Sequence, residues 1–228
     1  VEPEPWAQAW SDLGERWKNK ARSEEIAGKL TSAKEAYLKA YTYYGIARHP
    51  FPSSPGKKKA YDKTREMYLA AARFLNPPLE RIAIPFRGKE IVGYLRLPGK
   101  KPAPLIMHWG GIDNWKEERH SFAESFLKEG WGCFVMDSPG TGECPLLASP
   151  EAHQVHSAAL DYLSKRTEID AQRIAIVGSS FGGYWSTKMA HVEHQRLRAA
   201  VNWGGVIHYY FQPEWQERSR NADSYLFD

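Results

Sequence analysis

From residue 105 onwards, short apolar runs alternate with longer amphipathic ones. The apolar runs cover residues 105–108, 132–136, 173–177 and 199–203, and the amphipathic runs cover residues 115–129, 150–165 and 181–194. Strands that alternate with helices of ten or more residues are typical of a parallel sheet with helices on both faces. Ahead of them, residues 81–86 and 91–97 predict two strands around a turn at Arg87-Gly88. The sequence therefore predicts an α/β core over residues 79–228.

Residues 1–78 carry helical patterns instead. Trp6, Trp10, Leu13 and Trp17 recur at helical spacing. A second helix is expected to begin at Ser32, which forms a capping-box pattern with Glu35, and a third is expected over residues 57–75. We expect the aromatic stripes of these helices to pack helix against helix, with substrate lining as the alternative. The segment is predicted to be an N-terminal lid or cap.

The composition excludes several classes of protein. The chain has 228 residues, 42% hydrophobic and 25% charged, which is ordinary for a globular protein and unlike a disordered one. A net charge of +4 is too small to indicate nucleic-acid binding, and no apolar run approaches the ~20 residues of a membrane helix. Cys133 and Cys144 make no disulfide framework, and no signal-peptide pattern opens the chain. We therefore expect a cytoplasmic protein that binds neither nucleic acid nor membrane.

The strongest chemical signal follows the strand predicted over residues 173–177. This strand leads directly into Gly178-Ser-Ser-Phe-Gly182, and a helical pattern follows at once. Gly-x-Ser-x-Gly between a strand and a helix is typical of a nucleophile elbow. A Cβ at Gly178 or Gly182 would collide with a neighbouring element, and the helix directs free N–H groups toward the site. The sequence therefore predicts Ser180 as a catalytic nucleophile.

Acyl chemistry also needs donors for the oxygen that becomes negative. The first expected donor is the N–H of Phe181, directly after the nucleophile. The second is expected in the glycine-rich loop over residues 108–113, from Ile112 or else Gly111. The alternative is a glycine-rich turn without a catalytic role. His108 is interpreted as a packed residue at the end of a strand.

Other motifs are interpreted as structural. Residues 137–142 lack the spacing of a phosphate-binding loop and predict a turn at the rim of the site. His153 with His156, and His191 with His194, stand three residues apart, but nothing completes a zinc site. We interpret these histidines as solvated, and we expect no metal.

Several of these motifs together resemble a known family. They are Ser32-Ala-Lys-Glu-Ala-Tyr37, His49-Pro-Phe-Pro52, Gly110-Gly-Ile-Asp113 with Lys116-Glu-Glu118, Asp137-Ser-Pro-Gly-Thr-Gly142 and Gly178-Ser-Ser-Phe-Gly-Gly-Tyr184. The chain resembles the α/β-hydrolases grouped with 2,6-dihydroxypseudooxynicotine hydrolase, near fungal polyketide-shortening hydrolases and the fermentation/respiration switch protein. The resemblance implies an α/β-hydrolase fold under a helical N-terminal segment, a Ser-Asp-His triad, no metal or organic cofactor, and a homodimer. It implies ester substrates or activated ketones, some cleaved at a carbon–carbon bond beside an aromatic ring.

The chain departs from this pattern after the serine. Only 48 residues follow Ser180, and none of His191, His194 and His208 falls in the late loop that should supply the base. We therefore expect the triad acid and base to lie outside this sequence. The chain is then an N-terminal piece of a longer hydrolase, inactive alone, with its cap beginning after about residue 205. Glu214 is a candidate cap acid for a ketone substrate, with a solvated carboxylate as the alternative.

The leading hypothesis is a serine hydrolase that acts on a small acyl or ketone molecule through a tetrahedral intermediate. Carbon–carbon cleavage of an aromatic or polyketide-like ketone is placed ahead of plain carboxylester hydrolysis. A non-catalytic regulatory or binding protein of the same fold is the alternative from another class.

Overall fold

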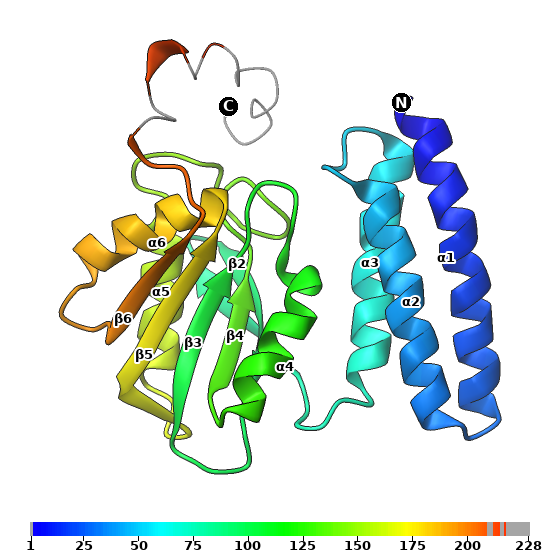
Figure 1. The fold of residues 1–228 in the computed structure, drawn as a ribbon, viewed down its shortest axis with the longest axis horizontal. Coiled ribbons are helices and arrows are strands. Elements are labelled where there is room, and N and C mark those ends of the chain that lie inside the picture. The colour runs from blue at the N-terminus through cyan, green and yellow to red at the C-terminus, as the bar shows by residue number, and fades with distance from the viewer. Residues whose placement is uncertain (1, 209–211, 215–216, 218–228) are drawn as a thin grey trace. The chain divides into compact units, whose positions relative to one another are not determined.

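The computed structural model describes residues 2–208, 212–214 and 217. The chain divides into two compact units, Val1–Leu79 and Glu80–Asp228 (Figure 1).

The first unit consists of three helices. They are α1 (Pro3–Ile26), α2 (Leu30–Arg48) and α3 (Pro55–Ala72). Figure 1 shows α2 lying between the other two. The predicted stripe of α2 is confirmed as its packing face, since its buried positions include Ala36, Tyr37, Ala40, Tyr44 and Ala47. Alanines at three of these positions let the neighbouring helices approach closely.

The tryptophans of α1 flank the helix contact and do not fill it. The buried residues of α1 are Ala7, Gly14, Lys18 and Ala21, whereas Trp6, Trp10 and Trp17 are only half-buried. Trp6 donates its indole N–H to the Ile46 carbonyl oxygen at 2.8 Å. The contact admits only small residues, because a Cβ on Gly14 would lie 2.9 Å from the Tyr44 ring. The predicted tryptophan core is therefore correct only in part.

The predicted capping box at Ser32 is wrong. Helix α2 begins at Leu30, and its N-cap residue, Lys29, makes no side-chain cap. The chain turns at Gly28, which has a φ of +73°. The helix can therefore begin after this turn, two residues before the predicted start at Ser32. Helix α3 also starts early, since Ser54 Oγ accepts the Lys57 N–H at 3.4 Å and acts as its N-cap.

The second unit is built on a six-stranded sheet. The strands are β1 (Glu80–Phe86), β2 (Lys89–Arg96), β3 (Ala103–Trp109), β4 (Gly132–Met136), β5 (Ile169–Ser179) and β6 (Ala199–Trp203). Their order is β1-β2-β4-β3-β5-β6. Strand β2 pairs antiparallel with β1 and β4, whereas β4, β3, β5 and β6 run parallel. The predicted mostly parallel α/β core is confirmed.

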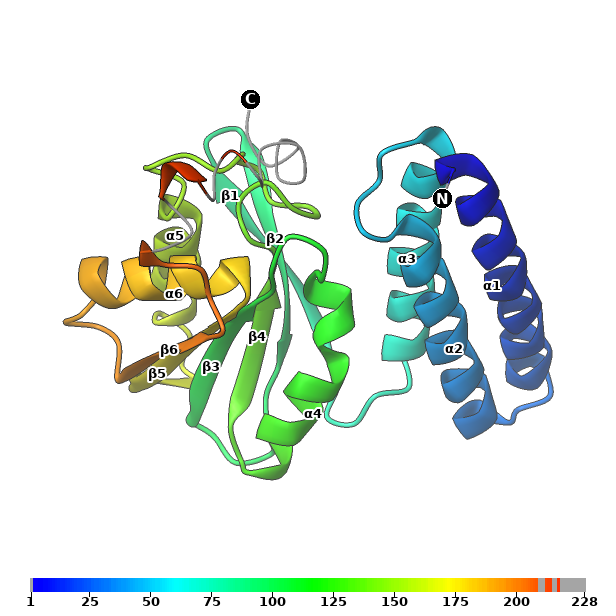
Figure 2. The same cartoon turned by 45° about the horizontal axis from the view of Figure 1, so that its top comes forward.

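Helices cover both faces of this sheet. They are the 3₁₀ helix η1 (Lys116–Arg119), α4 (His120–Lys128), α5 (Gln154–Leu163) and α6 (Phe181–Val192). Figure 2 shows α4 in front of the sheet and α5 and α6 behind it. Side chains of α4 pack on Ile106 and Val177, whereas the main core joins the sheet to α5 and α6. Every residue of β3 and β4 is buried, as expected for central parallel strands.

Two predicted helices start later than their patterns suggest. The run from residue 115 opens as η1, where the Glu118 carboxylate accepts the Trp115 N–H at 2.7 Å, and α4 begins only at His120. The run from residue 150 opens as a turn in which the Ser149 carbonyl accepts the Ala152 N–H at 3.1 Å. The N-cap residue of α5 is His153, whose side chain makes no capping hydrogen bond. Within the part of the chain that the structure describes, no helix combines the length and apolar character needed to cross a membrane.

Candidate active site

Ser180 lies at the junction between β5 and α6. Strand β5 ends at Ser179 and α6 begins at Phe181, so one residue makes the whole turn. Ser180 has φ 54° and ψ −128°, a conformation that costs a non-glycine residue about 1–3 kcal/mol. Its N–H donates to the Trp203 carbonyl at 3.0 Å, and its own carbonyl accepts the Gly183 N–H at 2.8 Å. The residue is exposed, so the turn presents the serine to solvent.

Two glycines beside Ser180 leave room for this turn. A Cβ on Gly178 would overlap the Gly182 carbonyl and lie 2.8 Å from Trp109 Nε1. A Cβ on Gly182 would lie 2.5 Å from the Gly110 carbonyl oxygen. The Trp109 indole donates to the Gly182 carbonyl at 2.9 Å and ties the end of β3 to the first turn of α6. The collisions that the sequence predicted at both glycines occur in this packing.

The loop after β3 lies directly against the serine. A Cβ on Gly111 would lie 2.8 Å from Ser180 Cβ, 2.9 Å from its Oγ and 3.5 Å from the Phe181 nitrogen. Gly111 and the Phe181 amide are thus brought together at the hydroxyl. Ile112 is half-buried and packs against the main core, while its carbonyl accepts the Trp115 indole N–H at 3.0 Å. Which of Gly111 and Ile112 donates to an oxyanion stays a prediction.

A buried ionic cluster lies behind this loop. Lys116 Nζ lies 2.8 Å from Asp137 Oδ2, 2.9 Å from Glu117 Oε1 and 2.7 Å from Glu143 Oε2. The Lys116 side chain is 0% exposed. Burial raises the pKa of the Glu117 carboxyl, which also accepts the Tyr94 hydroxyl at 3.0 Å. Sequence reasoning missed this cluster; the only signal was that Asp137 directly follows one predicted strand and that Lys116 lies at the start of the helix predicted after the strand before it.

The histidines of the described residues have different surroundings. His108 is fully buried, with Nδ1 2.8 Å from the Val177 carbonyl oxygen, so it is a packed residue at the end of a strand, as predicted. His156 is also fully buried, so the prediction of a solvated histidine is wrong there. It lies beneath the Trp109 ring, with ring centroids 4.1 Å apart. His191 and His194 are exposed at the other end of α6. Among described residues, no group of three or more His, Cys, Asp or Glu side chains could hold a metal ion.

The remaining predicted residue lies near the end of the described chain. Glu214 is exposed, and residues 215 and 216 lie outside the described residues. His208 is exposed as well. The role of Glu214 as a cap acid stays a prediction.

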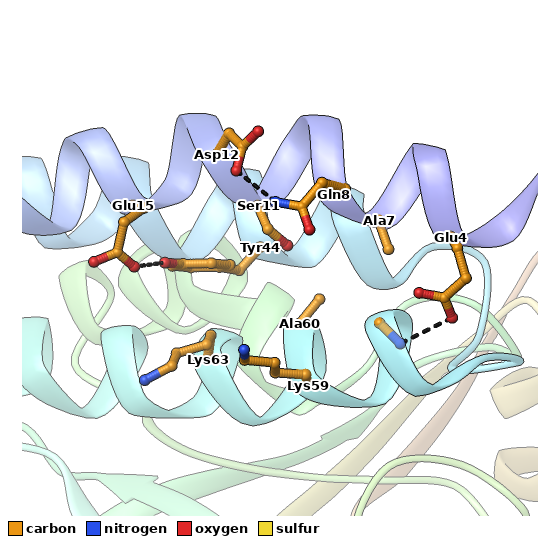
Figure 3. Close-up of a pocket in the computed structure, with 11 residues that line it drawn as sticks. Glu4, Ala7, Gln8, Ser11, Asp12, Glu15, Tyr44, Lys59, Ala60 and Lys63 are labelled. Carbon is orange, nitrogen blue, oxygen red and sulfur yellow. Dashed lines mark hydrogen bonds between the residues drawn. The ribbon is translucent and has the colours of Figure 1, made fainter.

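A cavity of about 180 Å³ opens within the helical unit, between α1 and α3 (Figure 3). Tyr44 is the one aromatic residue among those that line it, and its hydroxyl donates to Glu15 Oε2 at 2.7 Å. Figure 3 shows carboxylates on α1 opposite Lys59 and Lys63 on α3. The lining is polar, and it includes little of the predicted aromatic stripes.

Comparisons with known proteins find similar proteins among the esterases. A family model described as "Esterase FrsA-like" matches residues 3–226. Esterase FrsA of Yersinia pestis (strain Pestoides F) is 26% identical over 210 residues, which are 90% of this chain and 50% of the relative. Esterase FrsA of Yersinia pseudotuberculosis serotype O:1b matches with the same identity and coverage.

Solved structures give the same picture. The crystal structure of 2,6-dihydroxy-pseudo-oxynicotine hydrolase is similar with a TM-score of 0.84 and 27% identity, covering 96% of this chain and 64% of that one. AbyA5 is similar with a TM-score of 0.73 and 26% identity, covering 90% of this chain and 59% of that one. The predicted resemblance and the predicted α/β-hydrolase fold are thereby confirmed. The chain spans about half the length of the curated relatives it matches.

Proposed function

This chain belongs to the FrsA-like esterase family, and from that premise we propose that it supplies the nucleophile and the oxyanion donors of a serine hydrolase. Hydrolase function is common to the family and to the similar structure of 2,6-dihydroxy-pseudo-oxynicotine hydrolase. The single observation that carries the finer proposal is the meeting of Ser180, Gly111 and the Phe181 amide at one exposed turn.

The proposed reaction begins with attack of Ser180 Oγ on the carbonyl carbon of the substrate. The hydroxyl proton passes to a histidine that the complete protein supplies, because a serine without a base is a poor nucleophile. The carbonyl oxygen becomes negative and accepts the Phe181 N–H and the N–H of Ile112 or Gly111. The tetrahedral intermediate collapses, the leaving group takes the proton back from the histidine, and water then hydrolyses the acyl-enzyme.

Within this reaction, we place cleavage of an activated ketone ahead of a plain ester. The support is the similarity to a structure named as the hydrolase of 2,6-dihydroxy-pseudo-oxynicotine. In ketone cleavage the carbon–carbon bond breaks, and its electron pair leaves with the aromatic or polyketide-like carbon, which must be protonated. The histidine again gives up the serine proton, and Glu214 is proposed to assist the transfer of that proton to the carbon. The name of the Yersinia relatives supports the ester alternative, and parallel assays with an aryl ketone and an aryl ester distinguish the two.

Labelling of the full-length protein with a fluorophosphonate probe tests the nucleophile. The wild-type protein should be labelled, and Ser180→Ala should lose the label. Ser179→Ala is the matched control, because it deletes the neighbouring hydroxyl and leaves the strained position unchanged. Labelling that persists in Ser180→Ala would refute the proposal.

Two further parts of the proposal concern the complete enzyme. We propose that it is a cytoplasmic homodimer that acts on a small molecule, with the remainder of the hydrolase chain completing the site. Light scattering of the purified full-length protein tests the dimer, and a monomeric mass would contradict it.

A further inference from the structure

Two consecutive residues after β4 hold both ends of the segment Gly110–Lys116, called the oxyanion segment below. At one end, Ser138 donates its hydroxyl to the Gly110 carbonyl at 2.8 Å. At the other end, Asp137 Oδ1 accepts the Lys116 N–H at 2.9 Å. Asp137 is 2% exposed and Ser138 is 1% exposed, so water does not compete for either bond. Gly111, which faces Ser180, lies between these two anchors.

The second oxygen of Asp137 strengthens the same attachment. Asp137 Oδ2 accepts Lys116 Nζ at 2.8 Å and the Glu143 N–H at 2.9 Å. One carboxylate therefore joins the oxyanion segment to the loop that follows β4. A buried ion pair adds little net stability compared with apolar packing. The pair instead fixes the position of the Lys116 backbone, because Asp137 binds both the backbone N–H and the Nζ of Lys116.

The loop after β4 is shaped around these two residues. Gly142 has φ +51°, and a Cβ there would overlap the Asp137 carboxylate. Only glycine both adopts this conformation readily and leaves the space. Thr141 Oγ1 donates to the Ser138 carbonyl at 2.8 Å and closes the turn beneath the serine. The turn that the sequence predicted at the rim thus holds a neighbouring loop in place.

We propose that Asp137 and Ser138 are positioning residues for the oxyanion donor on the loop after β3. They act through the Lys116 and Gly110 backbone and touch neither Ser180 nor the substrate. The inference rests on the proposed function, since it assigns a role within that same site. Phe181, on α6, supplies its donor independently of them.

Kinetics of the full-length enzyme on a p-nitrophenyl ester test this role. Ser138→Ala and Asp137→Asn should each lower kcat by roughly 10- to 100-fold, less than the 10²–10³ lost with a whole donor. KM should stay within about threefold, because the ester is bound before the oxyanion forms. The affinity for a trifluoromethyl ketone, which forms a tetrahedral adduct with the serine, should fall in parallel with kcat/KM. A loss confined to KM would overturn the proposal.

Ser186→Ala is the matched control. Its buried hydroxyl donates to the Gly183 and Val201 carbonyls at 3.0 and 2.9 Å, and within the described part of the chain it makes no hydrogen bond to the oxyanion segment. It should cost stability comparable to Ser138→Ala and leave kcat within about twofold. An equal fall in kcat would show that any buried hydroxyl of this core matters, and the positioning role would be wrong.

Amide hydrogen exchange provides a readout that needs no turnover. In Ser138→Ala and Asp137→Asn, peptides covering residues 110–116 should exchange at least about tenfold faster than in the wild type, while β5 peptides should not change. Unchanged exchange in the segment would refute the anchoring. If the wild-type protein shows neither turnover nor labelling at Ser180, the proposed function is refuted instead. The exchange result would still decide whether Asp137 and Ser138 anchor the oxyanion segment.

Discussion

A Cβ atom on residue 111 would lie 2.9 Å from Ser180 Oγ and 2.8 Å from Ser180 Cβ. Because real Cβ atoms do not approach other atoms so closely, Gly111→Ala must push the loop or the serine aside. We expect kcat to fall by roughly 100-fold, as displacement of a donor by a fraction of an ångström weakens oxyanion stabilisation. Steady-state kinetics of the full-length enzyme measure this. Gly99→Ala, at an open position with nothing within 4 Å, should leave kcat unchanged.

Strain at the nucleophile should be measurable as stability. Ser180 adopts φ 54°, which glycine tolerates and alanine does not. Ser180→Gly should therefore be more stable than Ser180→Ala by about 1 kcal/mol, even though glycine is more flexible in the unfolded chain. Urea unfolding of the two variants measures the difference. An alanine variant as stable as the glycine variant would show that the turn is not strained.

The fold could be predicted largely from local pattern, because each strand and helix of the core carries its own period. Ile174–Val177, Ser180 and the following helix needed no information from distant residues, and the turn has the predicted context. The failures have two physical causes. The burial of His156 depends on a contact with a distant segment, Trp109 of β3, whereas the start of α2 depends on the backbone conformation of the neighbouring Gly28.

The same distinction applies to the site. Glycines at positions 178 and 182 could be predicted, since their neighbours follow from the motif. The pairing of Lys116 with Asp137 could not, because 21 residues separate them and a lysine in a sequence is ordinarily solvated. Only the folded sheet, which places β3 beside β4, brings the two loops together.

The Trp109 indole should stabilise the elbow by one hydrogen bond. Trp109→Phe removes the N–H that donates to the Gly182 carbonyl at 2.9 Å and leaves a buried acceptor without it. The matched control is Trp185→Phe, since Trp185 is 1% exposed and its indole N–H has no hydrogen-bond partner among the described residues. Both variants lose similar volume, so Trp109→Phe should be less stable than the control by about 1–3 kcal/mol. Equal urea midpoints would contradict this.

Two buried histidines should make the core unit sensitive to mild acid. Burial, assisted by the charge of Arg119 for His108, lowers the pKa of His108 and of His156 to about 3 in the folded protein. The unfolded chain binds these protons near pH ~6.5 and the folded protein does not, so stability is complete above that pH and decreases as the pH falls toward about 3. At pH 5, each histidine should lower the free energy of unfolding by about 2 kcal/mol relative to its value above pH ~6.5. Urea unfolding between pH 7 and pH 5 measures this decrease.

His156→Leu separates the two contributions to this acid sensitivity. It should reduce the loss of stability between pH 7 and pH 5 by about half, because His108 alone then takes up a proton on unfolding. His191→Asn, which replaces an exposed histidine on α6, is the control and should keep the full loss. The interval from pH 7 to pH 5 lies above the ordinary range of carboxylate pKa values, so ordinary carboxylates contribute little to the difference between the variants. If His156→Leu loses as much stability between pH 7 and pH 5 as the wild type, the His156 ring takes up its proton in the folded protein. The burial of that ring without a hydrogen-bond partner among the described residues would then not hold in solution.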